Sequence, residues 1–367
     1  MISVGIMAHC LISDLTLEEK VGQLLMVHFC GELANDDAKM LIQEVKVGGI
    51  VYYNWANGLT SVDQVKTLSA SLQTIAKTTR KAIPLLIAAD QEGRRVSRLK
   101  PNAQAPTSER QFTAFPDNET VAATKDPSLA TKYAFAIGEE MREVGINMNL
   151  APVVDVNCNP KNPIIGSRSF GNDPEIVTTF GKQALLGYKK AGVLSTLKHF
   201  PGHGDVTVDS HHDLPVVEKT LQELERMELK PFAQLATEAD SIMTAHLLVP
   251  ALDCEKCSTL SERTLSYLRN TIGFSGVIIS DSLVMQGVLK QTGSVSEAAI
   301  QALQAGCDIL LLGGRQLVEG KQPLELSASD IQQIHKDIIT AVKGGRVQEK
   351  RVDEAVQKIL KMKSRLP

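Results

Sequence analysis

The segment from Ser195 to Pro215 holds the densest group of side chains that can transfer protons or bind hydroxyls. It reads STLKHFPGHGDVTVDSHHDLP, and it contains Lys198, four histidines and three aspartates. An apolar, strand-like run over 191–197 leads into it, and its glycines and prolines predict a sharply bent loop. We therefore expect an active-site loop in this segment.

Within this loop, Asp209-Ser-His211 forms an Asp-x-His unit. In extended backbone, side chains two residues apart project to the same side, so the Asp209 carboxylate can orient the His211 imidazole. A histidine that titrates near neutrality suits proton transfer in both directions. The alternative is a surface histidine beside a surface aspartate, and the neighbouring Lys198 and His199 favour the catalytic interpretation.

The loop also contains the ligand types of a metal cluster. Its candidate ligands are His199, His203, Asp205, Asp209, His211 and His212. A metal-dependent hydrolase on a barrel would also be expected to have a His-x-His pair at the end of the first strand, where this chain has only His28. Cys254 and Cys257 form a lone CxxC pair, which is weak evidence for zinc or redox chemistry. We expect no metal and no cofactor, and loss of activity with a chelator would favour the metal interpretation.

Apolar runs that predict buried strands alternate along the chain with segments of helical periodicity. The predicted strands are 21–29, 48–53, 84–89, 146–156, 191–197, 241–247, 277–280 and 308–312. The predicted helices include 36–44, 61–79, 128–144, 174–191, 221–238, 261–270, 296–305, 329–343 and 348–363. Eight buried strands that alternate with helices indicate an α/β fold, a (β/α)8 barrel, in a single domain over 1–367 with its core at about 15–366. No Gly-x-Gly-x-x-Gly turn follows the first strand, which disfavours a dinucleotide-binding fold.

A barrel places catalytic groups at the carboxyl ends of its strands. Polar residues occupy five of these predicted ends: Asp90, Asp155, the pair Lys198 and His199, His246, and Asp281. Any one of them could cap a helix or form a rim salt bridge. Five in equivalent positions favour a shared catalytic function.

Composition excludes several classes of protein. The 367 residues have a net charge of −3, with Lys and Arg scattered, and only 4% are aromatic, which gives no support to nucleic-acid binding. No apolar run is long enough to cross a membrane, and we expect no export signal. Six cysteines fit no disulfide framework. These features predict a cytoplasmic protein with no nucleic-acid or membrane partner, and they do not predict its oligomeric state.

Four sequence blocks resemble glycoside hydrolase family 3, and within it the NagZ-type β-N-acetylglucosaminidases. They begin at Asp90 (DQEGRRVSR), Gly166 (GSRSFG), Lys198 (KHFPGHG, continuing through DSH at 209–211) and Ser280 (SDSLVM). The resemblance extends from about Leu15 to Leu366, and the third block is the most specific. It implies a metal-free, retaining exo-glycosidase that acts on muropeptides during peptidoglycan recycling.

The resemblance also implies a function for individual residues. Asp281 is similar to the family's nucleophile, His211 to its general acid/base, and Asp209 to the partner of that histidine. The residues that resemble those holding the N-acetylglucosamine substrate are Asp90, Arg98, Arg168, Lys198 and His199. His203 is expected to have a structural role.

The chain departs from the family pattern at Arg94, where a second glycine is usual, and at Ser282, where a second aspartate is common. Arg94 either narrows the site or points outward, and the insertion from Leu99 to Asp126 is expected to affect the region beyond the first sugar. A phosphorolytic enzyme of the same family and a catalytically silent sugar-binding barrel remain alternatives. A β-glucosidase is disfavoured because that branch lacks the Asp-Ser-His unit.

Overall fold

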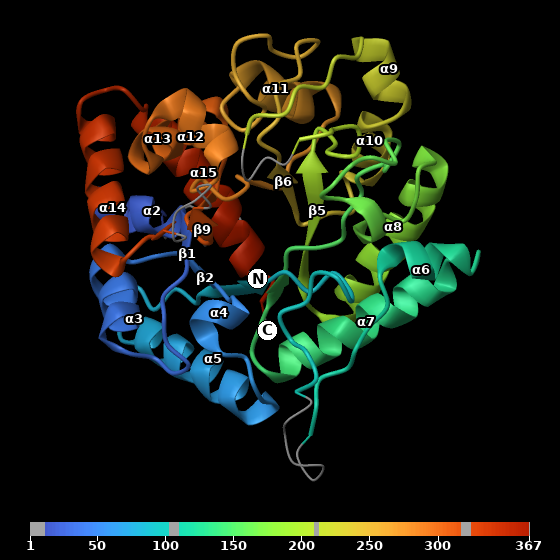
Figure 1. Ribbon diagram of the computed structural model, residues 1–367. Coiled ribbons are helices and arrows are strands. Elements are labelled where there is room, and N and C mark those ends of the chain that lie inside the picture. Colours follow the sequence, from blue (N-terminus) through green and yellow to red (C-terminus); the bar gives the residue numbers. More distant parts are fainter. Residues whose placement is uncertain (1–11, 103–109, 209–212, 317–323, 367) are drawn as a thin grey trace, which may run out of the picture.

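A barrel of eight parallel strands surrounded by helices organises the molecule (Figure 1). The computed structural model describes residues 12–102, 110–208, 213–316 and 324–366. The strands are β1 (Leu25–Val27), β2 (Gly49–Val51), β3 (Leu86–Ala89), β4 (Met148–Asn149), β5 (Leu194–Phe200), β6 (Ser241–Thr244), β7 (Val277–Ile279) and β8 (Leu310–Leu311). They pair in the order β7-β6-β5-β4-β3-β2-β1-β8, and a parallel bridge between Ile279 and Ile309 brings the two ends of the sheet together. The predicted (β/α)8 architecture is confirmed.

Helices and short turns connect the strands on the outside of the barrel. The α-helices are α2 (Leu17–Gln23), α3 (Asp36–Met40), α4 (Asn54–Asn57), α5 (Val62–Lys77), α6 (Asn118–Ala123), α7 (Ser128–Glu143), α8 (Pro174–Ala191), α9 (Leu221–Arg226), α10 (Leu229–Leu235), α11 (Glu262–Ser266), α12 (Gln286–Thr292), α13 (Val295–Ala305), α14 (Ala328–Lys343) and α15 (Glu349–Lys363). Two π-helices, η1 (Leu41–Val45) and η3 (Tyr267–Thr271), and one 3-10 helix, η2 (Gly166–Arg168), also occur. Strand β9 (Arg315–Gln316) pairs antiparallel with β10 (Leu324–Glu325). Among the described helices, none has the length and apolar character needed to cross a membrane.

Local sequence signals explain where these elements begin and end. Thr16 and Glu19 form a reciprocal capping box at the start of α2. In α8, Asp173 caps the amino terminus before Pro174, and Gly192 ends the helix with a φ of 75°. All eight strands are buried. Side chains inside the barrel pack against their inner face, and the surrounding helices cover their outer face.

Several predicted boundaries were wrong, and the predicted strand over 146–156 contains only the two residues of β4. The segment 21–29 does not form one strand, because Val21 to Gln23 complete α2 and β1 covers only Leu25–Val27. The predicted helix over 221–238 is divided into α9 and α10. Pro231 has no N–H to donate and would interrupt a continuous helix, whereas it is tolerated in the first turn of α10.

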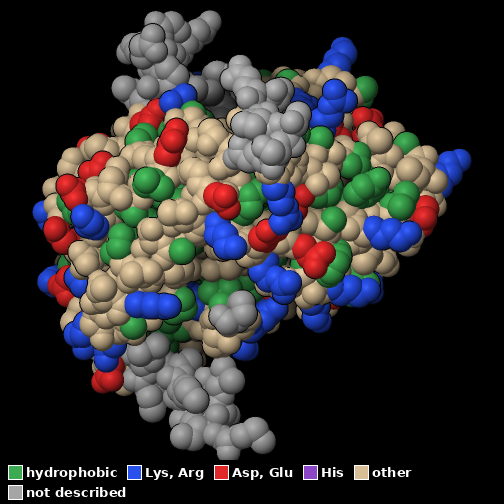
Figure 2. All heavy atoms as spheres, turned by 90° about the horizontal axis from the view of Figure 1, so that it is seen from below, with side chains coloured by type: hydrophobic (Ala, Val, Ile, Leu, Met, Phe, Trp, Pro, Cys, Tyr) green, Lys and Arg blue, Asp and Glu red, His purple; other side chains and the backbone are tan. Residues whose placement is uncertain are grey.

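Surface charge is mixed on the face shown in Figure 2. Basic and acidic side chains are interspersed over the described part of this face. This arrangement agrees with the net charge of −3. Phosphate-backbone binding would instead favour a clustered basic stripe.

Lys363 of α15 is buried in the protein interior, and replacing it should stabilise the fold. Its Nζ donates to Oε1 of Gln23 at 2.8 Å, and burial lowers its pKa from 10.5 to about 7. Because the folded-state pKa is below the unfolded-state pKa, the unfolded chain binds more protons between these values, so stability rises with pH from about 7 to 10.5. At roughly 1.4 kcal/mol per pKa unit, the cost of burying this lysine is about 5 kcal/mol at pH 6.

Lys363→Met should therefore increase the free energy of unfolding by about 2 kcal/mol at pH 6, after the loss of the Gln23 hydrogen bond. The gain should decrease at pH 9. Urea denaturation at both pH values measures it, with Lys361→Met as the exposed control from the same helix. A Lys363→Met variant that is less stable than wild type at pH 6 would contradict this prediction.

Candidate active site

A pocket of about 370 Å³ opens at the carboxyl ends of the barrel strands. Its volume is within the range of small-ligand sites. It brings together six residues that the sequence singles out, from four different βα segments: Asp90, Arg98, Arg168, Lys198, His199 and Asp281. Of the five predicted strand ends, those at Asp90, at Lys198 with His199, and at Asp281 line this pocket, whereas Asp155 and His246 are not among its lining residues.

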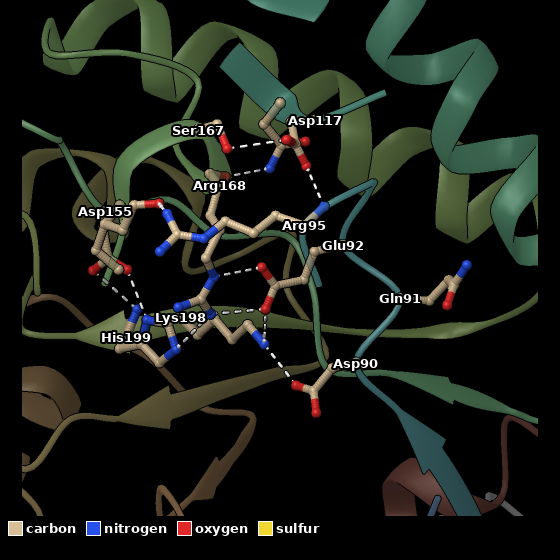
Figure 3. Close-up of polar contacts among 12 residues, drawn as sticks. Asp90, Gln91, Glu92, Arg95, Asp117, Asp155, Ser167, Arg168, Lys198 and His199 are labelled. Atoms are coloured by element: carbon tan, nitrogen blue, oxygen red, sulfur yellow. Dashed lines mark hydrogen bonds and ion pairs between the residues drawn. The ribbon is translucent and has the colours of Figure 1, made fainter. Parts of the chain in front are cut away.

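Lys198 lies at the centre of a buried array of charges (Figure 3). Its Nζ is 2.8 Å from Oδ1 of Asp90 and 2.6 Å from Oε1 of Glu92. The lysine side chain is only 2% exposed, because β5 directs it into the mouth of the barrel. A buried ammonium requires such partners, since an isolated buried charge is strongly unfavourable.

Arginines complete the array on both sides. Arg168 forms a bidentate ion pair with Glu92, in which Nε donates to Oε2 and Nη2 donates to Oε1, both at 2.8 Å. Arg98 donates from Nη2 to Oδ2 of Asp90 at 2.9 Å. Fork-shaped guanidinium contacts fix orientation as well as charge, so the array is a preformed, rigid set of donors and acceptors.

The pKa values of the two carboxyl groups reflect this arrangement. Burial alone would raise the pKa of Asp90, but the charges of Lys198 and Arg98 outweigh burial and hold the pKa well below its usual range. Burial acts in the same direction on Glu92, and Arg168 and Lys198 outweigh it, which lowers its pKa to about 2. Both carboxylates are therefore ionised acceptors at neutral pH, not proton donors.

Asp155 orients His199, which lies beside this charge array. Its Oδ2 lies 2.7 Å from Nδ1 of His199, and its Oδ1 accepts from the backbone N–H groups of His199 and His203 at 3.1 and 2.7 Å. On the other side of the ring, Nη2 of Arg168 lies 3.4 Å from Nε2 of His199. These contacts orient the His199 ring toward the charge array (Figure 3), and they engage both ring nitrogens, which does not suit a metal ligand.

His203 gives the site a predictable acid sensitivity. Burial, followed by the neighbouring His199, lowers the pKa of His203 from 6.5 to about 4. Because the unfolded chain takes up this proton first, stability should fall by about 3 kcal/mol as the pH decreases from 6.5 to 4. Urea denaturation across this range should give a smaller loss for His203→Gln. Parallel pH profiles for the variant and wild type would contradict the assignment.

Asp281 follows β7 and lies in the pocket wall. Its backbone N–H donates to Oγ1 of Thr244 at 3.2 Å, and its Oδ1 accepts from the N–H of Ser282 at 2.7 Å. His246 lies behind this turn, where its ring nitrogens contact Oγ1 of Thr259 and the carbonyl of Ser282 at 2.9 and 2.8 Å. His246 is thus a buried support of the turn that carries Asp281.

Aromatic residues form another part of the pocket wall. Arg98 lies over the Tyr53 ring at 5.1 Å, and Arg315 lies over the Trp55 ring at 4.1 Å. The pKa of Tyr53 is raised, first by burial and then by the carboxylates of Asp90 and Asp281. Rings combined with charged groups are suited to a ligand that has both apolar and hydroxyl-bearing faces.

The loop that carries Arg168 is supported by residues that the sequence did not single out. Asp117 accepts from the backbone N–H of Arg95 at 2.7 Å and from Oγ of Ser167 at 3.0 Å, as Figure 3 shows. Arg95 donates to the carbonyls of Pro163 and Ile165. In its described part, the insertion over 99–126 thus helps to position Arg168.

The two departures from the family pattern have clear positions. Arg94 is exposed and does not line the pocket, so it does not narrow the site. Ser282 lines the pocket, and its hydroxyl donates to the carbonyl of Gly313 at 2.5 Å. The serine therefore links the Asp281 turn to the segment after β8.

Asp209 and His211, the predicted acid/base pair, lie outside the described residues, as does His212. The described flanks of this segment are anchored by ion pairs: Lys219 to Asp205 at 2.7 Å and Lys290 to Asp213 at 2.7 Å. At Gly204, an added Cβ would lie 1.7 Å from the carbonyl of Val156, so only glycine fits there. The assignments of Asp209 and His211 stay predictions.

Glu92 is a member of the charge array that the sequence analysis did not single out. It belongs to the block that starts at Asp90, but it received no function because it lies two residues beyond the strand end. Its carboxylate links Lys198 to Arg168. The available signal was its place in the same motif, on the same side of the chain as Asp90.

Comparisons with known proteins show which proteins the chain is similar to. The family model described as "Glycosyl hydrolase family 3 N terminal domain" matches residues 16–362. Beta-hexosaminidase A from Pseudoalteromonas piscicida is 34% identical over 96% of this chain and 62% of its own length. A beta-hexosaminidase from Xylella fastidiosa (strain M23) is 34% identical over 80% of this chain and 84% of its own length.

A similar solved structure is the glycoside hydrolase family 3 beta-N-acetylglucosaminidase from Paenibacillus sp. str. FPU-7. It is 42% identical, with a TM-score of 0.86, and the match covers 96% of this chain and 62% of that one. This chain thus spans about three fifths of the length of the Pseudoalteromonas and Paenibacillus proteins.

Proposed function

The chain belongs to glycoside hydrolase family 3, and on that premise we propose that it is a retaining exo-β-N-acetylglucosaminidase. The observation that carries the proposal is the buried array of Asp90, Glu92, Lys198 and Arg168, which shares one pocket with Asp281. Such an array can bind several hydroxyls of one terminal sugar, while a carboxylate remains at the anomeric carbon.

In the proposed first step, the Asp281 carboxylate attacks the anomeric carbon as the bond to the leaving oxygen breaks. Protonated His211 gives its proton to that oxygen, and the sugar becomes an ester of Asp281. In the second step, neutral His211 takes a proton from water, whose oxygen attacks the same carbon and releases Asp281. Two displacements retain the anomeric configuration. Asp209 orients His211 throughout.

The charge array supplies orientation. Asp90 and Lys198 offer an acceptor and a donor at the base of the pocket, while Arg98, Arg168 and His199 surround them. Because the ion pairs already hold these groups in place, little orientational entropy is lost when the sugar binds. We assign all five residues to binding of the N-acetylglucosamine unit.

The proposed natural substrates are muropeptides with terminal N-acetylglucosamine, degraded during peptidoglycan recycling in the cytoplasm. Support for the sugar comes from the similar beta-N-acetylglucosaminidase and beta-hexosaminidases. Support for the pathway comes from the sequence resemblance. Trp55 and Arg315 line the same pocket, where they can contact the group attached to the first sugar.

Hydrolysis of an aryl β-N-acetylglucosaminide tests the proposal. We expect turnover that resists a chelator, and His211→Ala and Asp209→Ala should reduce kcat by about 10²- to 10⁴-fold, the range typical of general acid/base catalysis. The decrease should be smaller for leaving groups of low pKa, which need little protonation. Chelator-sensitive turnover would instead support the metal-cluster interpretation.

Addition of phosphate distinguishes hydrolysis from phosphorolysis. A hydrolase should release free N-acetylglucosamine at all phosphate concentrations. Formation of N-acetylglucosamine 1-phosphate would assign the phosphorolytic alternative, and tight sugar binding without turnover would assign the silent sugar-binding barrel.

A further inference from the structure

We propose that His28, Cys30 and Glu325 form a binding site for one thiophilic divalent cation at the rim of the pocket. Zn²⁺ matches this donor set best, because imidazole, thiolate and carboxylate are its usual protein ligands. The site is separate from the charge array around Lys198, and it rests on a distinct set of contacts.

The geometry of the three side chains carries the proposal. One ring nitrogen of His28, Sγ of Cys30 and one carboxylate oxygen of Glu325 all lie within 4.8 Å of one another. Ligand atoms around a tetrahedral zinc are about 3.5 Å apart, so the cluster needs to contract by only about 1 Å. Three protein ligands would leave the fourth position to water.

His28 provides an independent indication of a ligand. It is 1% exposed. The backbone of Leu312 interacts with its ring, but neither ring nitrogen has a hydrogen bond of good geometry among the described residues. Its ring packs in an edge-to-face arrangement against both Tyr53 and Trp55, at centroid distances of 5.9 and 5.0 Å. Buried polar atoms are rarely left without a partner, and a cation at this cluster would satisfy one of the two nitrogens.

The thiol of Cys30 forms a hydrogen bond to Glu325, and a bound cation would take the place of the thiol proton. Sγ of Cys30 donates to Oε2 of Glu325 at 3.2 Å, while Oε1 of Glu325 accepts from Nε of Arg315 at 2.6 Å. A cation bound by the thiolate and Oε2 would leave the Arg315 contact on the other oxygen intact. The site can therefore load without dismantling the pocket rim.

A second group of potential metal ligands differs from the group at His28 in its electrostatic surroundings. Cys158, Asp205 and Glu228 are also close enough to share an ion, but a lysine already supplies the positive charge. Nζ of Lys219 is 2.7 Å from Asp205 and 3.7 Å from Sγ of Cys158, and it also contacts Glu228. At the His28 cluster the positive group is Arg315, which contacts Oε1 of Glu325 and leaves Oε2 to the Cys30 thiol.

The single tryptophan of the chain provides a direct probe. Trp55 contacts the His28 ring, so Co²⁺, used as a coloured substitute for Zn²⁺, should quench its fluorescence at a stoichiometry of one. A thiolate-to-cobalt charge-transfer band should appear in parallel, and Zn²⁺ should reverse both signals. Neither readout depends on glycosidase activity, so failure here leaves the proposed enzyme function untouched.

Variants then locate the site. Cys30→Ser should abolish the charge-transfer band and weaken binding by more than about 100-fold, since even changes behind a metal ligand cost 10- to 100-fold. Glu325→Gln should weaken binding by at least about tenfold, and Cys254→Ser, which removes another exposed thiol, should bind like wild type. Absence of quenching in wild type, or quenching unchanged in folded Cys30→Ser, would overturn the proposal.

Discussion

Replacing Asp281 with asparagine should lower kcat/KM for an aryl β-N-acetylglucosaminide by at least about 10⁴-fold, equivalent to about 5.5 kcal/mol of transition-state stabilisation. The amide cannot form the glycosyl ester, but its oxygen can still accept from the N–H of Ser282, as Oδ1 of Asp281 does at 2.7 Å. The variant should therefore fold and bind sugar while failing to turn it over.

Ser282→Ala is the matched control for this prediction. It changes the next residue in the same pocket wall and removes the hydrogen bond to the Gly313 carbonyl. It leaves the nucleophile in place, so its kcat/KM should stay within about tenfold of wild type, the cost of one hydrogen bond. Asp281→Asn with activity in that same range would show that another residue is the nucleophile.

Replacing Lys198 with methionine should reduce both activity and stability. Methionine has a similar length, but it leaves Asp90 and Glu92 as adjacent buried carboxylates, each with one arginine partner. Removing one partner of a buried ion pair costs about 3–5 kcal/mol. We expect a free energy of unfolding lower by that amount and a kcat/KM lower by at least about 10³-fold, because the sugar loses its central donor.

Urea denaturation and steady-state kinetics measure the two effects. Lys182→Met is the control, because it breaks the exposed ion pair with Glu238, and such pairs contribute about 0–1 kcal/mol. A folded Lys198→Met variant with near-normal kcat/KM would mean that the array is only structural.

The fold was predictable because its signals are local. The sequence itself shows the apolar strand runs and the capping residues. It also shows polar residues near the strand ends, at Asp90, Lys198 and Asp281, and the structure has strands at the corresponding places. The division of 221–238 into α9 and α10 was missed because helical periodicity outweighed Pro231 in the prediction. The contact between Ile279 and Ile309 that joins the ends of the sheet depends on the whole barrel, and no short pattern encodes it.

The sequence predicted several of the residues that line the pocket, among them Asp90, Lys198 and Asp281, but not how their side chains are connected. Sequence spacing placed Asp155 and His246 at equivalent strand ends, yet one carboxylate holds His199 and the other side chain supports the Asp281 turn from behind. Such differences depend on which neighbour each side chain meets across the barrel. The same reason explains Glu92, whose function appears only when Arg168 and Lys198 meet in space.

The most direct test of the central claim is mass spectrometry of the enzyme after reaction with a fluorinated N-acetylglucosaminide that has a good leaving group. Fluorine slows breakdown of the glycosyl-enzyme, so the covalent intermediate should accumulate. A retaining mechanism through Asp281 predicts one sugar per chain, attached to the peptide that contains Asp281 and absent from Asp281→Asn. A label on a different residue, or inversion of the anomeric configuration in the product of the ordinary substrate, would contradict the account.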